Sequence, residues 1–155
     1  MSTEANKALV RSWYDVPSLE EWLRQRPEVK NVEATEMEKL KIVLPAFFAP
    51  EYIVHRPEGD MPFEGFVQYQ ISRLTAFPDF SCTVEDIIAE GQKVMVRYIV
   101  RGTHLDMFRG IPATGKKIEM GGISILRCAG GKIVEGWSYL DTLGMMQQLG
   151  IIPSQ

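Results

Sequence analysis

Gly131-Lys-Ile-Val-Glu-Gly-Trp137-Ser-Tyr139-Leu-Asp141-Thr-Leu-Gly-Met-Met-Gln-Gln-Leu-Gly150 is the stretch that decides the fold, because an apolar strand there leads directly into a helix. Successive side chains of a strand point to opposite faces, so one face carries Glu135, Trp137, Tyr139 and Asp141. The carboxylate of Asp141 therefore lies at the end of an aromatic row. An acid beside aromatic rings is a candidate general acid or base.

A structural interpretation of Asp141 stays open beside the catalytic one. An aspartate immediately before a helix is a preferred N-cap residue. Aromatic neighbours disfavour the charged carboxylate, whereas the start of a helix favours it. Gly144 stands where a reciprocal capping box has Glu or Gln, which weakens the capping interpretation. The two roles are compatible in one residue.

Composition limits the partners and the compartment. A chain of 155 residues with 45% apolar residues is predicted to form a single domain, residues 1–155, with room for an internal pocket. Its net charge is −3 and its Lys and Arg residues are dispersed, which argues against nucleic acid as a partner. The longest apolar run, 42–50, is short, and the N-terminus lacks the pattern of a secretory signal, so we expect a cytoplasmic protein with no membrane segment.

The two cysteines, Cys82 and Cys128, have no His or Cys neighbour at the spacing of metal ligands. No secretory context favours a disulfide between them. We expect two buried thiols and no bound metal.

Periodicity predicts an α+β fold in which helices precede a mostly antiparallel sheet. Apolar residues at helical spacing predict helices over 5–14, 19–24, 34–48 and 65–77, with a kink or a break at Pro45. A short strand is expected at 52–55, followed by a loop at 58–62. Two-residue alternation then predicts four consecutive strands, over 80–89, 93–104, 116–128 and 132–140.

Several motifs of the chain are typical of one family when taken together. They are Asn6-Lys-Ala-Leu-Val-Arg-Ser-Trp-Tyr14, Phe48-Ala-Pro-Glu-Tyr-Ile-Val-His55, Phe77-Pro-Asp-Phe80, Ile88-Ala-Glu-Gly-Gln-Lys-Val94, Gly102-Thr-His104, Gly110-Ile-Pro-Ala-Thr-Gly115-Lys116 and the stretch Gly131 to Gly150 quoted above. With these motifs the chain resembles the SnoaL-like polyketide cyclase family, within the nuclear transport factor two-like superfamily.

The resemblance implies a cone-shaped curved sheet wrapped by N-terminal helices around an apolar cavity. It also implies a homodimer, a hydrophobic small-molecule substrate and no metal or organic cofactor. In family members that close polyketide rings, an aspartate at the position of Asp141 is the acid/base of an intramolecular aldol condensation. The reaction expected here is therefore acid/base enolisation of a polyketide- or terpenoid-like ketone or ester by a cyclase or isomerase.

Further site residues follow from the resemblance. His104 and His55 match histidines common in the family, and either could polarise a carbonyl or hold a proton. The alternative for each is a histidine satisfied by backbone groups at a strand end. The expected substrate-binding residues are Tyr14, Phe48, Trp137, Tyr139 and Met120, any of which is also compatible with a core position.

Two segments depart from the family pattern. The charged segment 24–41 is expected to be a helical insertion that caps or reshapes the mouth of the cavity. The strand 120–126 has almost no polar side chains, which favours a less oxygenated substrate, such as a terpenoid or a simpler polyketide.

Two other functions remain open, because one fold supports many activities. The first is a non-catalytic module for small-molecule binding or dimerisation. The second is an epoxide hydrolase or dehydratase, for which Arg97, Arg101, Asp106 and Asp141 would have to converge.

Overall fold

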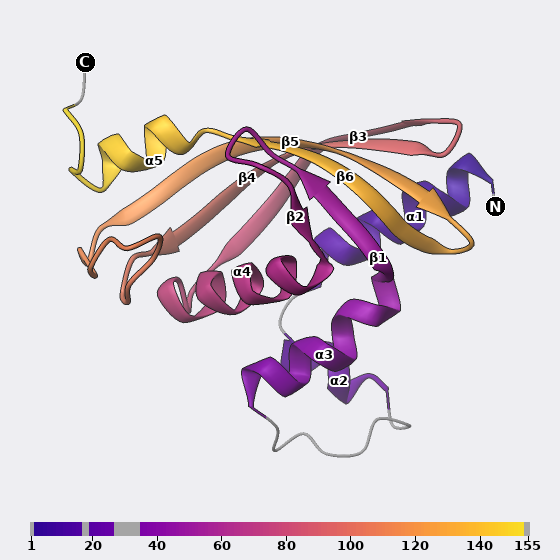
Figure 1. Cartoon of the computed structure of the whole chain (residues 1–155), viewed down its shortest axis with the longest axis horizontal. Coiled ribbons are helices and arrows are strands. Elements are labelled where there is room, and N and C mark those ends of the chain that lie inside the picture. Colours follow the sequence, from indigo (N-terminus) through magenta and orange to yellow (C-terminus); the bar gives the residue numbers. More distant parts are fainter. Residues whose placement is uncertain (1, 17–18, 27–34, 154–155) are drawn as a thin grey trace.

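The computed structural model describes residues 2–16, 19–26 and 35–153 (Figure 1). The described helices are α1 (Thr3–Tyr14), α2 (Leu19–Arg24), α3 (Glu36–Phe47), α4 (Phe63–Ala76) and α5 (Thr142–Gln148). The strands are β1 (Phe48–His55), β2 (Met61–Pro62), β3 (Ser81–Glu90), β4 (Lys93–Thr103), β5 (Lys117–Ala129) and β6 (Lys132–Leu140).

One curved sheet organises the molecule. Its strand order is β2-β1-β6-β5-β4-β3, and every neighbouring pair is antiparallel except β1 and β6, which run parallel. Helix α1 packs on β3 and β4, and α4 packs on β1. In Figure 1 the sheet spans the top of the molecule, with α4 below it and α2 and α3 projecting downwards. The predicted α+β class and mostly antiparallel sheet are confirmed.

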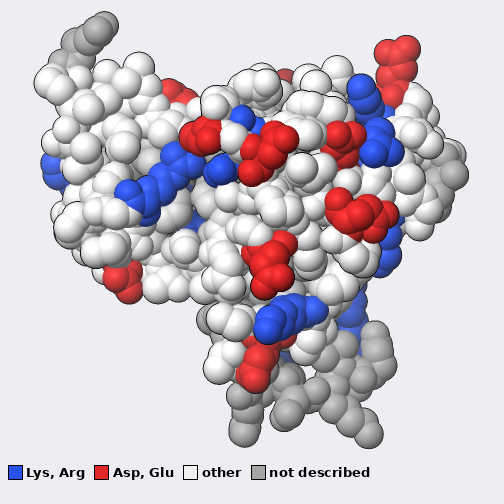
Figure 2. Space-filling view, viewed as in Figure 1, with Lys and Arg blue, Asp and Glu red and all other residues white. Residues whose placement is uncertain are grey.

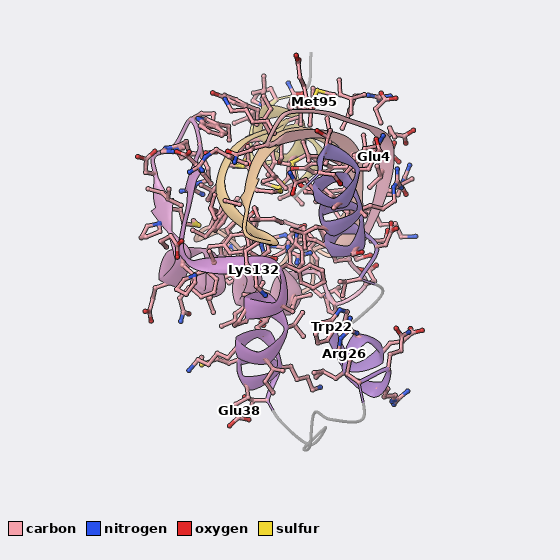
Figure 3. All side chains as sticks on the ribbon, turned by 90° about the vertical axis from the view of Figure 1, so that its right-hand side faces the viewer. Glu4, Trp22, Arg26, Glu38, Met95 and Lys132 are labelled. Atoms are coloured by element: carbon pink, nitrogen blue, oxygen red, sulfur yellow. The ribbon has the colours of Figure 1, made fainter. Side chains whose placement is uncertain are left out.

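Side-chain alternation along β4 identifies the inner face of the sheet. Val94, Val96 and Val100 are buried there, whereas Lys93 and Arg97 on the opposite face are exposed. A shift of the strand by one residue would expose all three valines to water. The apolar surface that they bury therefore determines which face of β4 turns inward. Figure 3 shows the strands curling around the interior, with α1 alongside.

Side chains cap the starts of α1 and α3. The hydroxyl of Ser2 accepts from the amide of Ala5 at the start of α1, and Thr35 and Glu38 form a reciprocal capping box at the start of α3. Of the kink or break predicted at Pro45, the break does not occur, since α3 continues through Pro45 to Phe47. Lys132 on β6 donates to the carbonyls of Pro45 and Ala46, at 2.7 and 3.1 Å, and so satisfies groups at the helix end (Figure 3).

Two parts of the chain differ from the sequence prediction. Strand β1 begins at Phe48 rather than at residue 52, because it continues directly from α3. The predicted loop at 58–62 contains β2, where Met61 pairs with Val54. Of the predicted insertion 24–41, residues 27–34 lie outside the described residues.

Charges of both signs are mixed over the face shown in Figure 2, without a field of one sign. No helix among the described residues is long and apolar enough to cross a bilayer.

Candidate active site

A cavity of about 480 Å³ lies between the inner face of the sheet and helices α1 and α4. Its volume is within the range of small-molecule pockets. The apolar part of the wall comes from every layer of the fold: Trp13, Val16, Leu40, Phe48, Val54, Met61, Phe66, Leu74, Phe77, Phe80, Val100, Phe108, Ile118, Met120, Leu126, Leu140 and Met145. The site therefore favours a largely apolar ligand.

A row of hydroxyl groups crosses the apolar wall. The hydroxyl of Tyr98 on β4 lies 3.1 Å from that of Ser124 on β5, and Ser124 lies 2.9 Å from the hydroxyl of Ser138 on β6. The ring of Tyr14 from α1 packs on Tyr98 with centroids 5.1 Å apart. All four side chains line the cavity. We call Tyr14, Tyr98, Ser124 and Ser138 the hydroxyl row.

Burial keeps the phenols of the cavity protonated. Desolvation raises the pKa of Tyr98 to about 12, and it raises the pKa of Tyr14 well above its ordinary value. Hydrogen bonding to Ser124 partly offsets both shifts. The row can thus donate hydrogen bonds to a ligand oxygen near neutral pH, whereas its phenols are poor bases.

Ionisable groups also reach the cavity. Asp15, at the end of α1, lines it without an ion pair to any described residue, and Arg73 of α4 lines it beside Phe80. Glu58 and Arg109 line it as an ion pair 3.5 Å apart. The cavity thus combines an apolar wall with a few placed polar groups.

The position of Arg109 depends on a tight turn. Phe108 and Ile111 pair with each other, and both are buried. The turn between them requires positive φ at Arg109 (52°) and Gly110 (77°). An arginine in the left-handed region carries a steric cost. The buried residues at both ends of the turn hold the backbone in this conformation despite that cost.

The structure divides the predicted substrate-binding residues between two faces. Tyr14, Phe48 and Met120 line the cavity. Trp137 and Tyr139 lie on the outer face of β6, where the ammonium of Lys93 approaches the ring of Trp137 at 5.1 Å and Tyr139 is 61% exposed. Their predicted place in the cavity wall is wrong, because Ser138 and Leu140 take the inward positions of this strand.

Asp141 shares the outer face with those aromatics, as its spacing predicted, and it caps α5. Its Oδ1 accepts from the amide of Gly144 at 2.9 Å. The carboxylate is exposed and borders a shallow groove on the outer face, together with Arg97 and Tyr139. The capping interpretation is confirmed, and the predicted acid/base does not line the cavity.

His104 is fully buried and does not line the cavity. Its ring stacks on Phe77, and its Nδ1 lies 3.0 Å from the hydroxyl of Thr114. The backbone of His104 exchanges hydrogen bonds with Gly115 and Lys116. These contacts close the base of the loop 105–116 and agree in part with the structural alternative for this histidine, but its buried Nε2 has no hydrogen-bond partner among the described residues.

His55 bridges two carboxylates on the rim of the sheet. Its Nδ1 lies 2.8 Å from Asp60, and its Nε2 lies 2.8 Å from Glu135. The hydrogen bond to Glu135, and then the one to Asp60, raises the pKa of His55. The hydrogen bonds from His55 and from Arg127 lower the pKa of Glu135. An imidazole with both nitrogens engaged in this way links β1 to β6 through Glu135 and does not face a cavity ligand.

None of the four residues required for epoxide opening lines the cavity, although Arg97 and Asp141 border the same groove on the outer face. Arg97 pairs with Asp86, and Arg101 pairs with Glu119, both across neighbouring strands of the outer face. The expected thiols are free: Cys128 is buried, and Cys82 is half-buried in the cavity wall. Burial raises the pKa of each thiol to about 11, so neither is an activated nucleophile.

Sequence reasoning missed Arg73, Gln70, Ser124, Ser138 and Asp15. One signal was available in α4, where Phe66, Gln70 and Arg73 follow helical spacing and thus place two polar residues on an apolar stripe. Ser124 and Ser138 give no such signal, because a single serine on an apolar strand is common and does not by itself indicate a functional site.

A curved sheet closed by helices over an apolar cavity with a polar row defines a cone-shaped α+β fold. The family model of the SnoaL-like polyketide cyclases matches residues 29–149. The chain therefore belongs to the SnoaL-like polyketide cyclase family.

Solved structures agree with this assignment. IdmH of Streptomyces antibioticus, a proposed polyketide cyclase, is 33% identical over 74% of this chain and 87% of its own, with a TM-score of 0.60. AclR of Streptomyces galilaeus, a proposed hydroxylase, is 24% identical over 98% of this chain and 100% of its own, with a TM-score of 0.75, and shows the fold. A search of curated proteins found no significant match.

Proposed function

We propose that the protein is a cofactor-independent cyclase or isomerase that enolises a polyketide- or terpenoid-like ketone or ester held in the cavity. The hydroxyl row is the observation that carries this proposal. A ketone oxygen gains negative charge as its α-proton leaves, and donors fixed in an apolar wall stabilise that charge without having to reorganise. Tyr98, held by Ser124, and the neighbouring Tyr14 are such donors.

The base that removes the α-proton is a carboxylate in this proposal. Asp15 has the better position, because it follows Tyr14 directly and lines the cavity without an ion pair to any described residue. Asp141 is the second candidate, supported by the family resemblance. Its carboxylate lies on the outer face, one residue beyond Leu140 of the cavity wall.

Replacing Tyr98 by phenylalanine should slow enolisation. We expect the rate of deuterium exchange into 1-tetralone and ethyl 2-naphthoylacetate, corrected for the spontaneous reaction, to fall about tenfold, since one neutral hydrogen bond contributes roughly 0.5–1.5 kcal/mol. Exchange is followed by NMR in D₂O.

Tyr69→Phe is the matched control, because it removes a cavity phenol outside the hydroxyl row. Its exchange rate should stay within about twofold of wild type. Equal losses in the two variants would contradict a specific role for the row.

A binding module without catalysis is the second candidate function. It is favoured by one observation: none of Asp141, His104 and His55 lines the cavity. Saturable binding of the two ketones by wild type with no enzyme-dependent exchange would support the module and overturn the enzyme.

A second copy of the chain is the proposed partner of the outer sheet face. The charges there already pair across strands, as Arg97 does with Asp86, while Ile88, Ile123, Ile125 and Tyr139 are 39–61% exposed. A neutral apolar surface of this kind suits a two-fold contact with itself.

Ile123→Glu should convert a dimer into a monomer, because each two-fold contact would bury the new charge unpaired. Size-exclusion chromatography with light scattering measures the mass. Met107→Glu is the control, since Met107 is 59% exposed in the loop 105–116, away from that face. A wild-type monomer, or a dimer that survives Ile123→Glu, would contradict this interface.

A further inference from the structure

Arg73 presents a charged group to the apolar cavity. Helix α4 carries it in the wall, and its guanidinium lies over the ring of Phe80, 3.9 Å from the ring centroid. Its Nε–H donates to Oε1 of buried Gln70 at 2.9 Å, and an Nη2–H donates to the same oxygen. These contacts fix both the plane and the direction of the guanidinium.

No carboxylate balances this cation among the described residues. Ion pairs among the described residues engage Lys7, His55, Arg97, Arg101, Arg109 and Arg127, and none of these pairs engages Arg73. Desolvation lowers the pKa of Arg73, and no carboxylate is among the groups that oppose this shift. Arg73 is half-buried, and a partly desolvated cation without a counter-charge is costly, so a ligand that supplies the negative charge would bind more tightly.

The unused hydrogen-bond donors define the shape of that ligand. Gln70 occupies the edge formed by Nε–H and one Nη2–H. The outer edge, formed by Nη1 and the second Nη2–H, makes no hydrogen bond to a described residue, and Nη1 is not among the atoms sealed from solvent. Two parallel N–H groups at this spacing match the two oxygens of a carboxylate.

We propose that Arg73 binds a carboxylate of the substrate through its outer edge, which makes the natural ligand of the cavity an apolar polyketide-like acid rather than a neutral ketone or ester. This inference rests on the proposed function in one respect, that the cavity takes an apolar carbonyl compound. The hydroxyl row then meets the reacting carbonyl, while Arg73 sets which end of the ligand enters. Phe80 holds the cation flat, so a carboxylate approaches in the plane of the guanidinium.

A matched pair of probes tests the charge preference. Anthraquinone-2-carboxylate and its methyl ester differ in the carboxyl group alone, and Trp13 in the cavity wall reports binding by fluorescence quenching. We expect wild type to bind the acid at least about tenfold more tightly than the ester, a ratio within the reach of one charge-assisted contact. Arg73→Gln should bring the ratio close to one while changing the affinity for the ester by less than about threefold.

Arg97→Gln is the control for net charge, because it removes one cation on the outer face. It should keep the preference for the acid. Arg73→Lys preserves the charge without the paired donors and should keep only part of the preference. Thermal melting of all variants separates lost binding from lost folding.

The outcomes distinguish this inference from the proposed function. Equal binding of acid and ester by wild type, which requires no variant, overturns the inference and leaves the proposed function standing. A preference for the acid that survives in folded Arg73→Gln overturns it as well. Failure of both probes to bind contradicts the apolar ligand class of the cavity and therefore overturns both.

Discussion

The free energy of unfolding is expected to fall by about 3–5 kcal/mol when Phe48 is replaced by alanine. The ring of Phe48 is 2% exposed, and its centroid lies 4.7 Å from that of Tyr52, 4.9 Å from that of Phe66 and 5.0 Å from that of Trp13. Alanine removes the ring that these aromatics share, and the void joins the existing cavity instead of collapsing. Urea denaturation followed by circular dichroism measures the change.

This prediction tests whether Phe48, expected to contact substrate, is also a core residue. Leu143→Ala is the control, because Leu143 is 62% exposed on α5 and its loss should cost less than about 0.5 kcal/mol. A Phe48→Ala variant that loses under about 1 kcal/mol would show that Phe48 serves chiefly the ligand. In either case the dependence of the unfolding free energy on urea concentration must have the same slope as in wild type. A different slope would indicate a change in the compactness of the native or the denatured state.

Two-residue alternation predicted the long strands well. The ends of β4 and β6 lie within a residue of their predicted positions. Alternation also placed Glu135, Trp137, Tyr139 and Asp141 on a common face. Alternation did not reveal which face of β6 turns inward, because both faces carry apolar groups. An error in the choice of face places every side chain of the strand on the wrong side of the sheet.

Register explains why the cavity wall was harder to predict than the strands. Tyr98 of β4 pairs with Gly122 of β5, and Gly122 pairs with Leu140 of β6. These three residues therefore lie on the same inner face of the sheet. A Cβ on Gly122 would lie 2.6 Å from Leu140 and 2.8 Å from Tyr98, so only glycine fits there. A bulge between Arg127 and Cys128 shifts the pairing with β6, and nothing in the local sequence marks it.

The polar groups of the cavity come from positions that local patterns treat as unremarkable. The strand 120–126 was expected to offer few polar contacts, and Ser124 is its single hydroxyl. It becomes central because Tyr98 and Ser138 approach it from the strands on either side. This convergence of three hydroxyl groups depends on tertiary packing and leaves no local pattern in the sequence. Asp141 is easier to recognise, because it stands in the sequence at the junction between a strand and a helix.

Deuterium exchange into 1-tetralone is expected to fall by about 10²–10⁴ in Asp15→Asn, since general acid–base catalysis contributes factors of this size. Asparagine keeps the size of the side chain and removes the basic carboxylate at the cavity. Because Asp15 is exposed at the end of α1, the melting temperature should hardly change. Rates are measured by NMR against the spontaneous exchange.

Asp141→Asn is the matched comparison, because asparagine still accepts the hydrogen bond from Gly144 and so preserves the cap of α5. With its carboxylate on the outer face, this variant should keep an exchange rate close to that of wild type. The opposite pattern, with exchange lost in Asp141→Asn and kept in Asp15→Asn, would return the base to the position that the family resemblance indicates. It would also require α5 or a second subunit to bring that carboxylate to the ligand, because Leu140 and Tyr98 separate it from the cavity. Exchange that survives both substitutions would leave the reaction without its proposed base and favour the binding module.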